Sequence, residues 1–149
     1  MIFGKRHNLE FSKISDQIYL GNNMCCGHHF LKLKELGISV DIDLEEEKSE
    51  RPAGVEVYLW LPVKDHTPPT QTQLEIGTAA IGMAVKSGKK VYVHCKNGHG
   101  RAPTMVAAYL ILSGKTPQEA VGLIKVARLQ IHLEESQLKA LEKFWENLK

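Results

Sequence analysis

The pattern of hydrophobic and polar positions predicts strands and helices that alternate along the chain. Alternating or continuous apolar runs predict core strands at residues 18–21, 38–44, 55–61 and 89–94. Apolar residues at helical spacing predict helices at residues 30–36, 70–86, 101–112, 116–127 and 138–148. Two apolar segments on either side of Asp16-Gln17 add a small hairpin. This alternation predicts an α/β fold, in which helices flank a central, mostly parallel sheet of four to five strands with right-handed crossovers.

Local signals place the ends and the buried faces of these elements. Capping boxes are predicted to begin at Thr70 and at Thr116, so a helix starts after each threonine. Pro62 is expected to end the strand at 55–61, which is apolar enough to lie at the centre of the sheet. The buried faces of the last two helices are predicted at Ala120, Leu123, Ile124, Ala127, Leu138, Leu141, Trp145 and Leu148.

The composition is that of an ordinary globular protein. The 149 residues are 43% hydrophobic and 24% charged, and we expect a single domain over residues 1–149 that acts as a monomer. The net charge of +2 comes without a basic stripe that carries aromatic residues, so no nucleic-acid partner is expected. Residues 1–13 lack the apolar core of a signal peptide, and no run is long enough to span a bilayer, so membrane insertion is not expected either.

One stretch combines the features that an anion-binding loop needs. The strand at Val91–Val93 runs into Cys95, a loop with two glycines, and Arg101 at the start of an apolar helix. The glycines allow successive N–H groups to turn inward as a nest, and the helix N-terminus adds partial positive charge. The sequence therefore predicts a phosphate-binding loop between a core strand and a buried helix.

Cys95 and Arg101 are the candidate reactive residues of this loop. A cysteine at a helix N-terminus beside an arginine exists largely as thiolate, which makes Cys95 a candidate nucleophile. The planar fork of Arg101 suits two oxygens of a phosphoryl group in a way that lysine cannot match. The alternative is a buried structural cysteine beside a helix-capping arginine. Because a reactive thiol has to stay reduced, the three cysteines favour a cytoplasmic protein.

A second loop offers a proton donor. The acid loop, defined as residues 63–69, follows a predicted strand at the edge where open α/β sheets place their sites, and it holds Asp65 and His66. Phosphoryl transfer from an ester needs a donor for the leaving oxygen, and the same group can later activate water. The alternative for Asp65 is a turn former, and His66 would replace it if Asp65 points away.

The sequence His94-Cys95-Lys96-Asn97-Gly98-His99-Gly100-Arg101, called the signature loop below, resembles the active-site loop of cysteine-dependent protein tyrosine phosphatases. The compact chain around it is most similar to dual-specificity phosphatases. The resemblance implies that Cys95 forms a phosphocysteine and that Asp65 is the general acid and base. It implies a phosphate-binding role for Arg101 and for Lys96, Asn97, Gly98, His99 and Gly100. It places His94, Ala102 and Thr104 in supporting positions, and it implies no metal and no cofactor.

Ala102 departs from the family pattern. Relatives usually carry serine or threonine directly after the signature arginine, where the hydroxyl bonds the cysteine sulfur and eases its departure. Some members carry Arg-Ala-Pro, as this chain does at residues 101–103. The resemblance therefore implies intact phosphate binding and phosphocysteine formation, but slow release of the intermediate. Thr104 either compensates or faces the core.

The resemblance leaves several substrates open. Phosphotyrosine, and phosphoserine or phosphothreonine, in proteins or small phosphate esters are expected first, because the chain shows no membrane-binding module or strongly basic face. Lys96 and His99 add positive charge to the loop, as in relatives that act on inositol lipids, so a phosphoinositide is the alternative. Glucan phosphatases share the Arg-Ala-Pro spelling. A hypothesis of another class is a catalytically weak module that binds phosphate.

Other polar clusters are expected to be structural. Asp41 and Asp43 lie on a core strand, and the resemblance gives only Asp43 a role, as support for a loop. Residues 45–54 are predicted to form a solvated acidic surface loop. Residues 128–137 resemble a segment that packs near the signature loop, and neither its basic residue nor Gln137 is assigned a catalytic role. Adjacent pairs cannot easily close a tetrahedron, so no metal is expected at Cys25, Cys26, His28 and His29.

Overall fold

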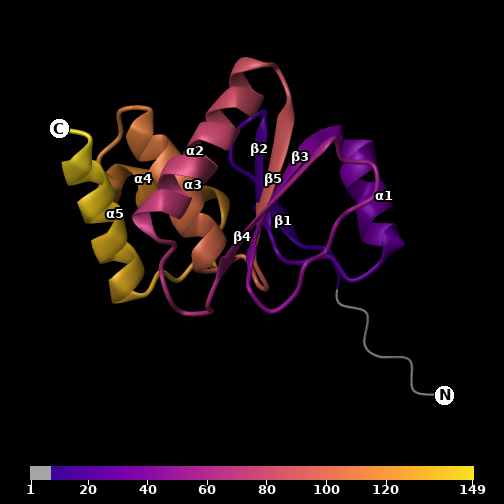
Figure 1. The fold of residues 1–149 in the computed structure, drawn as a ribbon, viewed down its shortest axis with the longest axis horizontal. Helices are drawn as coiled ribbons and strands as arrows, with labels where there is room; N and C mark the ends of the chain where they lie inside the picture. The colour runs from indigo at the N-terminus through magenta and orange to yellow at the C-terminus, as the bar shows by residue number, and fades with distance from the viewer. Residues whose placement is uncertain (1–7) are drawn as a thin grey trace.

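The computed structural model describes residues 8–149 and contains a five-stranded sheet with helices on both faces (Figure 1). The first seven residues, part of the segment compared with a signal peptide, lie outside the described residues. The strands are β1 Phe11–Lys13, β2 Ile18–Gly21, β3 Ile38–Glu45, β4 Val57–Val63 and β5 Lys90–His94. The helices are α1 Gly27–Leu36, α2 Gln71–Lys86, α3 Arg101–Leu112, α4 Pro117–Ala127 and α5 Glu135–Asn147.

The strand order β1-β2-β5-β3-β4 places β5 at the centre of the sheet. β1 pairs antiparallel with β2, as the predicted hairpin requires, and the other neighbours are parallel. α1 covers one face, and α2 to α5 cover the other (Figure 1). The larger core lies under α2 to α5, and a smaller one under α1 is formed by Tyr19, Met24, Leu33, Ile38 and Tyr92. The predicted α/β fold is confirmed.

Two predicted elements differ from the structure in their position. α1 begins at Gly27, three residues before the predicted start at Phe30. β4 lies at the edge of the sheet, and Pro62 belongs to it, so the prediction of a central strand that ends before Pro62 is wrong. An edge strand tolerates proline because one of its sides has no ladder partner that needs the missing N–H.

The predicted helix starts are confirmed, but the predicted buried faces are too wide. The Thr70 and Thr116 side chains accept the backbone N–H of Gln73 at 3.1 Å and of Glu119 at 3.2 Å. In α4 and α5 the residues that are exposed against prediction are Leu123, Ala127, Leu138 and Leu148. The buried residues of these two helices are Pro117, Ala120, Ile124, Gln137, Leu141 and Phe144. Both helices pack on α3 with a narrow stripe, since they form the outer end of the helical layer (Figure 1).

The topology brings three loops to one edge of the sheet. β3, β4 and β5 are parallel neighbours, so the segments that follow their carboxyl ends meet there. These segments are the acidic stretch after Glu45, the acid loop after β4, and the signature loop after β5. The buried helix α3 begins at the same edge, and its N-terminus faces the point where they meet.

Candidate active site

The signature loop curls around the sulfur of Cys95 at the end of the central strand. Cys95 is buried, and the backbone N–H of Gly98 donates to its Sγ at 3.3 Å. Gly98 has φ of +72°, and a Cβ there would lie 2.6 Å from the Gly21 carbonyl oxygen. Only glycine therefore allows the turn that aims this N–H at the sulfur. A hydrogen bond of this kind stabilises a thiolate.

Arg101 lies at the first position of α3 and is almost completely buried. Its two Nη atoms donate to the Glu47 carboxylate at 2.6 and 3.0 Å, and Nη1 also donates to the Val63 carbonyl at 2.8 Å. This hydrogen bonding with Arg101 lowers the pKa of Glu47, although burial opposes the shift. Within residues 8–149 the Arg101 Nε–H has no hydrogen-bond partner, which leaves a donor for an oxygen of a phosphoryl group.

Glu47 corrects the prediction for residues 45–54. That stretch was expected to be solvated, yet Glu45 and Glu50 are buried and Glu47 holds the side chain of Arg101. A local run of acidic residues is typical of a surface loop, and the pairing with an arginine 54 residues later depends on the fold. The available signal was the position of these acids directly after a core strand, at the edge that carries the site.

The acid loop brings Asp65 to the same site. Its Oδ1 lies 3.3 Å from Nη2 of Arg101, and the side chain is 46% exposed. His66 adopts a left-handed conformation, with φ of +65°, and its backbone N–H donates to Asp65 Oδ1 at 3.0 Å. The His66 N–H and Nη2 of Arg101 thus both lie against Oδ1 of Asp65, while the carboxyl group stays partly open to solvent.

One cavity of about 190 Å³ joins the predicted residues. It is lined by Asp65, His66, Cys95, Asn97, His99, Gly100, Arg101, His132, Glu134 and Gln137. Such a cavity can hold a phosphoryl group between a sulfur nucleophile, a guanidinium and a carboxyl group. Lys96 and Gly98 do not line it, so the Lys96 side chain contributes nothing to the cavity, and Gly98 acts through its backbone N–H, which donates to Cys95.

Ala102 and Thr104, which were predicted to support the signature loop, lie in the first turn of α3 and are part of the core. Ala102 is fully buried and brings no hydroxyl to the sulfur. Thr104 is also fully buried, and its Oγ1 donates to the Gly100 carbonyl at 2.7 Å. Of the two alternatives for Thr104, the structure shows the one in which it faces inward, where it braces the end of the loop.

Arg128 and Gln137, which the resemblance places near the signature loop without a catalytic role, both contact the site. The buried Arg128 donates from Nε to the Gly98 carbonyl at 2.8 Å and from Nη2 to the Asn97 carbonyl at 2.9 Å. By holding these carbonyls outward it leaves the loop amides free to turn inward. Gln137 is buried, lines the cavity and donates to the Thr67 carbonyl at 3.2 Å, which ties α5 to the acid loop.

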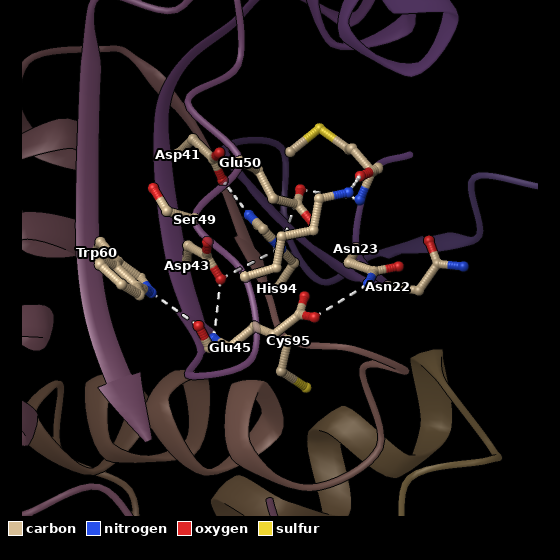
Figure 2. A network of polar contacts seen from close by, with 12 residues as sticks. Asn22, Asn23, Asp41, Asp43, Glu45, Ser49, Glu50, Trp60, His94 and Cys95 are labelled. Atoms are coloured by element: carbon tan, nitrogen blue, oxygen red, sulfur yellow. Dashed lines mark hydrogen bonds and ion pairs between the residues drawn. The ribbon is translucent and has the colours of Figure 1, made fainter. Parts of the chain in front are cut away.

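A buried carboxylate network lies behind the nucleophile, formed by Asp41, Asp43, Glu45 and Glu50 around His94 (Figure 2). His94 Nε2 lies 2.7 Å from Asp41 Oδ1, and Nδ1 lies 3.9 Å from Asp43 and 4.0 Å from Glu50. Asp43, predicted to support a loop, accepts the Glu45 N–H at 2.8 Å and the Tyr58 hydroxyl at 2.7 Å. The Cys95 sulfur points away from the His94 ring (Figure 2).

Three groups of the network, Asp43, Glu50 and His94, bind protons more tightly in the folded chain than in the unfolded one. Burial raises the pKa of Asp43 to about 6 and that of Glu50 to about 7, although the His94 charge opposes both shifts. Burial disfavours a charged His94, but Asp41, Asp43 and Glu50 outweigh it and raise the pKa of His94 to about 10. An imidazolium therefore compensates part of the negative charge behind Cys95.

These shifts predict that the free energy of unfolding falls as the pH rises. A raised pKa in the folded state means stability that is present below the unfolded value and lost as the pH passes the folded one. For Asp43 and Glu50 the loss extends to about pH 6 and 7, and for His94 it runs from 6.5 to about 10. Thermal unfolding should therefore show a higher Tm near about pH 5.5 than near about pH 8.5.

A variant of Glu50 tests how much of this pH dependence of stability comes from the network. Glu50→Gln should remove about 3 kcal/mol of the fall in unfolding free energy that occurs between pH 4.5 and about pH 7, because glutamine does not titrate. The exposed Glu56, replaced by glutamine, is the matched control and should leave the slope as it is. A wild-type Tm that rises over this range would contradict the interpretation.

A second cluster joins Cys25, Cys26 and His29, whose candidate ligand atoms all lie within 4.8 Å of one another. His29 Nδ1 accepts the backbone N–H of Cys25 at 3.1 Å, so a neutral ring carries its proton on Nε2. A metal bound at Nε2 would need the proton on Nδ1 instead and would cost this hydrogen bond. The donor set is thus close together but not arranged for a metal, and the expectation of no metal stays a prediction.

Comparisons with known proteins agree with the geometry. A family described as "Polymorphic toxin system, DSP-PTPase phosphatase" matches residues 20–115. Phosphatidylglycerophosphatase and protein-tyrosine phosphatase 1 of Mus musculus is 41% identical over 99 residues, which cover 65% of this chain and 51% of that protein. Dual specificity protein phosphatase 5 of Homo sapiens is 33% identical over 122 residues, covering 76% of this chain and 30% of that protein. The chain spans about half or less of these relatives.

Solved structures share the fold over nearly the whole chain. The crystal structure of PTPMT1 has a TM-score of 0.84 at 30% identity and covers 93% of this chain and 96% of its own. The structure of human DUSP28 has a TM-score of 0.82 at 24% identity, with coverage of 92% and 96%. The second likeness concerns the fold alone.

Proposed function

The chain belongs to the DSP-PTPase family, the dual-specificity type of cysteine-based phosphatase, and from this premise we propose that it hydrolyses phosphate monoesters through a phosphocysteine on Cys95. The observation that carries the proposal is that Cys95, Arg101 and Asp65 line one small cavity at the carboxyl ends of β4 and β5. Three groups with complementary chemistry converge there from two loops that lie 30 residues apart in the sequence.

In the first step the loop amides and Arg101 hold the three non-bridging oxygens of the phosphoryl group. The Cys95 thiolate attacks phosphorus in line, so a sulfur–phosphorus bond forms while the ester oxygen–phosphorus bond breaks. Asp65 gives its proton to the leaving oxygen, and an alcohol or phenol departs. Glu47 keeps the guanidinium in place through its Nη atoms, while Nε is available to the substrate.

In the second step water attacks the phosphocysteine, Asp65 accepts a proton from it, and phosphate and thiolate are released. The departing thiolate regains the hydrogen bond from the Gly98 amide. Ala102 supplies no hydroxyl to assist, and Thr104 is bonded to the Gly100 carbonyl. Hydrolysis of the phosphocysteine is therefore the slow step of the proposed cycle.

Phosphotyrosine and small aryl phosphates are the substrates we place first, with phosphoserine and phosphothreonine in proteins next. The family's dual-specificity type and a cavity with a single arginine support this order. The second candidate is a lipid phosphate, favoured by similarity to a phosphatidylglycerophosphatase and to PTPMT1, whose structure was also solved in complex with PI(5)P. A nucleophilic thiol has to stay reduced, so we place the protein in the cytoplasm. None of the helices within residues 8–149 is long and apolar enough to cross a membrane.

The assay that tests the proposed acid compares two leaving groups. Asp65→Asn should lower kcat/KM for phenyl phosphate, which reports formation of the phosphocysteine, by about 100-fold, because phenoxide is a poor leaving group that needs a proton. The loss for p-nitrophenyl phosphate should be much smaller, since nitrophenoxide leaves without help. Rates at substrate concentrations well below KM give kcat/KM for both esters, with the fully exposed Asp16→Asn as the matched control.

Equal losses for the two substrates would remove Asp65 from the role of acid. The same assay decides between an enzyme and a weak phosphate-binding module. A module would bind inorganic phosphate in calorimetry but would turn over neither ester.

A further inference from the structure

The charge at the mouth of the cavity bears on which monoesters enter it, provided that the proposed phosphatase activity holds. The lining contains one arginine, Arg101, and two acidic residues, namely Asp65, the proposed general acid, and Glu134. No lysine is among the lining residues in the described part of the chain. The lysines of the adjacent loops, Lys64 and Lys96, are exposed and lie outside the lining.

The positive charge of Arg101 is already shared before a substrate binds. Both Nη atoms pair with Glu47, and Nη2 also lies 3.3 Å from Asp65. The site can therefore neutralise one phosphoryl group but carries little surplus for a second anion. Any further anionic group of the substrate meets the charges at the mouth of the cavity.

Glu134 is the carboxylate at this mouth. It directly precedes α5, is 39% exposed, and its Oε1 lies 3.2 Å from Nδ1 of His66. Its backbone N–H donates to Gln137 Oε1 at 2.8 Å, and Gln137 in turn donates to the Thr67 carbonyl at 3.2 Å. The Glu134 side chain contacts the acid loop at His66, and its backbone is linked to Thr67 of the same loop through Gln137. Both links hold the Glu134 carboxylate beside the acid loop.

Of the histidines in the lining, His99 has its pKa shifted away from the charged form. Burial lowers the pKa of His99, and the nearby Arg128 acts in the same direction, although Glu10 opposes them. His66 Nδ1 lies 3.2 Å from Glu134 Oε1, and this contact orients the carboxylate beside the acid loop. The mouth of the cavity is therefore acidic beside a phosphate site that is close to balanced.

We infer that Glu134 is a specificity-determining residue that selects phosphate monoesters without a second anionic group next to the phosphate. An anion near Glu134 would be repelled at short range in a partly enclosed cavity, where the dielectric is lower than in water. The substrate class that fits is a single phosphate ester whose remainder is neutral or cationic, such as phosphotyrosine in a neutral or basic peptide. Bisphosphates and similar polyanions are disfavoured.

The test compares two soluble substrates, p-nitrophenyl phosphate and myo-inositol 1,4-bisphosphate. The ratio of kcat/KM for the bisphosphate to that for the monophosphate should rise about threefold in Glu134→Gln and about tenfold in Glu134→Arg at low salt. Both increases should come from KM and shrink as salt is added. A defect in the acid loop would lower kcat/KM for both substrates together and leave the ratio of the two values unchanged. Glu135→Gln, an exposed carboxylate that pairs with Lys139 at 3.2 Å, is the matched control.

A binding measurement keeps the inference separate from the proposed chemistry. In a Cys95→Ser background, calorimetry should show that Glu134→Gln strengthens pyrophosphate binding more than phosphate binding. An unchanged ratio in both variants and both measurements would overturn the inference, as would a wild-type preference for the bisphosphate. Failure of the proposed function would show differently, as no turnover of p-nitrophenyl phosphate by the wild type.

Discussion

Replacement of Cys95 by serine is expected to lower the turnover of p-nitrophenyl phosphate by at least about 10⁴-fold. A serine hydroxyl is not ionised at neutral pH, and the hydrogen bond from the Gly98 amide cannot ionise it without a base. Steady-state rates of the purified variant measure the loss. Cys25→Ser and Cys26→Ser, outside the cavity, serve as controls and should retain activity.

Binding of inorganic phosphate to Cys95→Ser shows whether the loop is still formed. Phosphate should bind to this variant, because the loop amides and Arg101 that hold it remain. Turnover close to that of the wild type would remove Cys95 from the role of nucleophile.

Arg101→Lys is expected to lower kcat/KM for the same ester by about 10³-fold. In Arg101 the two Nη atoms hold Glu47 and the Val63 carbonyl, and Nε–H remains for the phosphoryl group. The single nitrogen of a lysine ammonium group cannot reach all of these partners at once. Lysine keeps the positive charge of Arg101, so the loss of kcat/KM measures the contribution of the planar guanidinium geometry. The exposed Arg51→Lys is the matched control.

Because Arg101 is buried, thermal unfolding has to accompany the rates, so that a folding defect is not mistaken for a catalytic one. A loss of less than about tenfold in a folded variant would mean that a point charge suffices at this position.

The residues that local patterns identify are those whose partners lie close in the sequence. Cys95 and Arg101 belong to one loop with a glycine turn between them, and their relation can be predicted from spacing alone. Asp65 could be named as a candidate because the carboxyl ends of parallel strands meet at one edge of the sheet, whereas its role as the acid is implied by the family resemblance. The alternation of strands and helices was sufficient for the fold class.

The residues that were missed depend on contacts between distant segments. Glu47 lies in an acidic run that is locally indistinguishable from a solvated loop, and its partner is Arg101, 54 residues away. The resemblance places a basic residue of 128–137 near the signature loop, but only the fold shows that Arg128 binds the Gly98 carbonyl, 30 residues before it. The edge position of β4 was also missed, because an apolar strand beside one parallel neighbour and under a helix has the same pattern as a central one.

The most direct test of the account is to trap the intermediate. Wild-type protein mixed with p-nitrophenyl phosphate and quenched in acid during turnover should carry one phosphoryl group, found by peptide mass spectrometry on Cys95. The group should accumulate because Ala102 leaves its hydrolysis unassisted, and it should be absent from Cys95→Ser. Full turnover with Cys95 unmodified, or a phosphoryl group on another residue, would contradict the account.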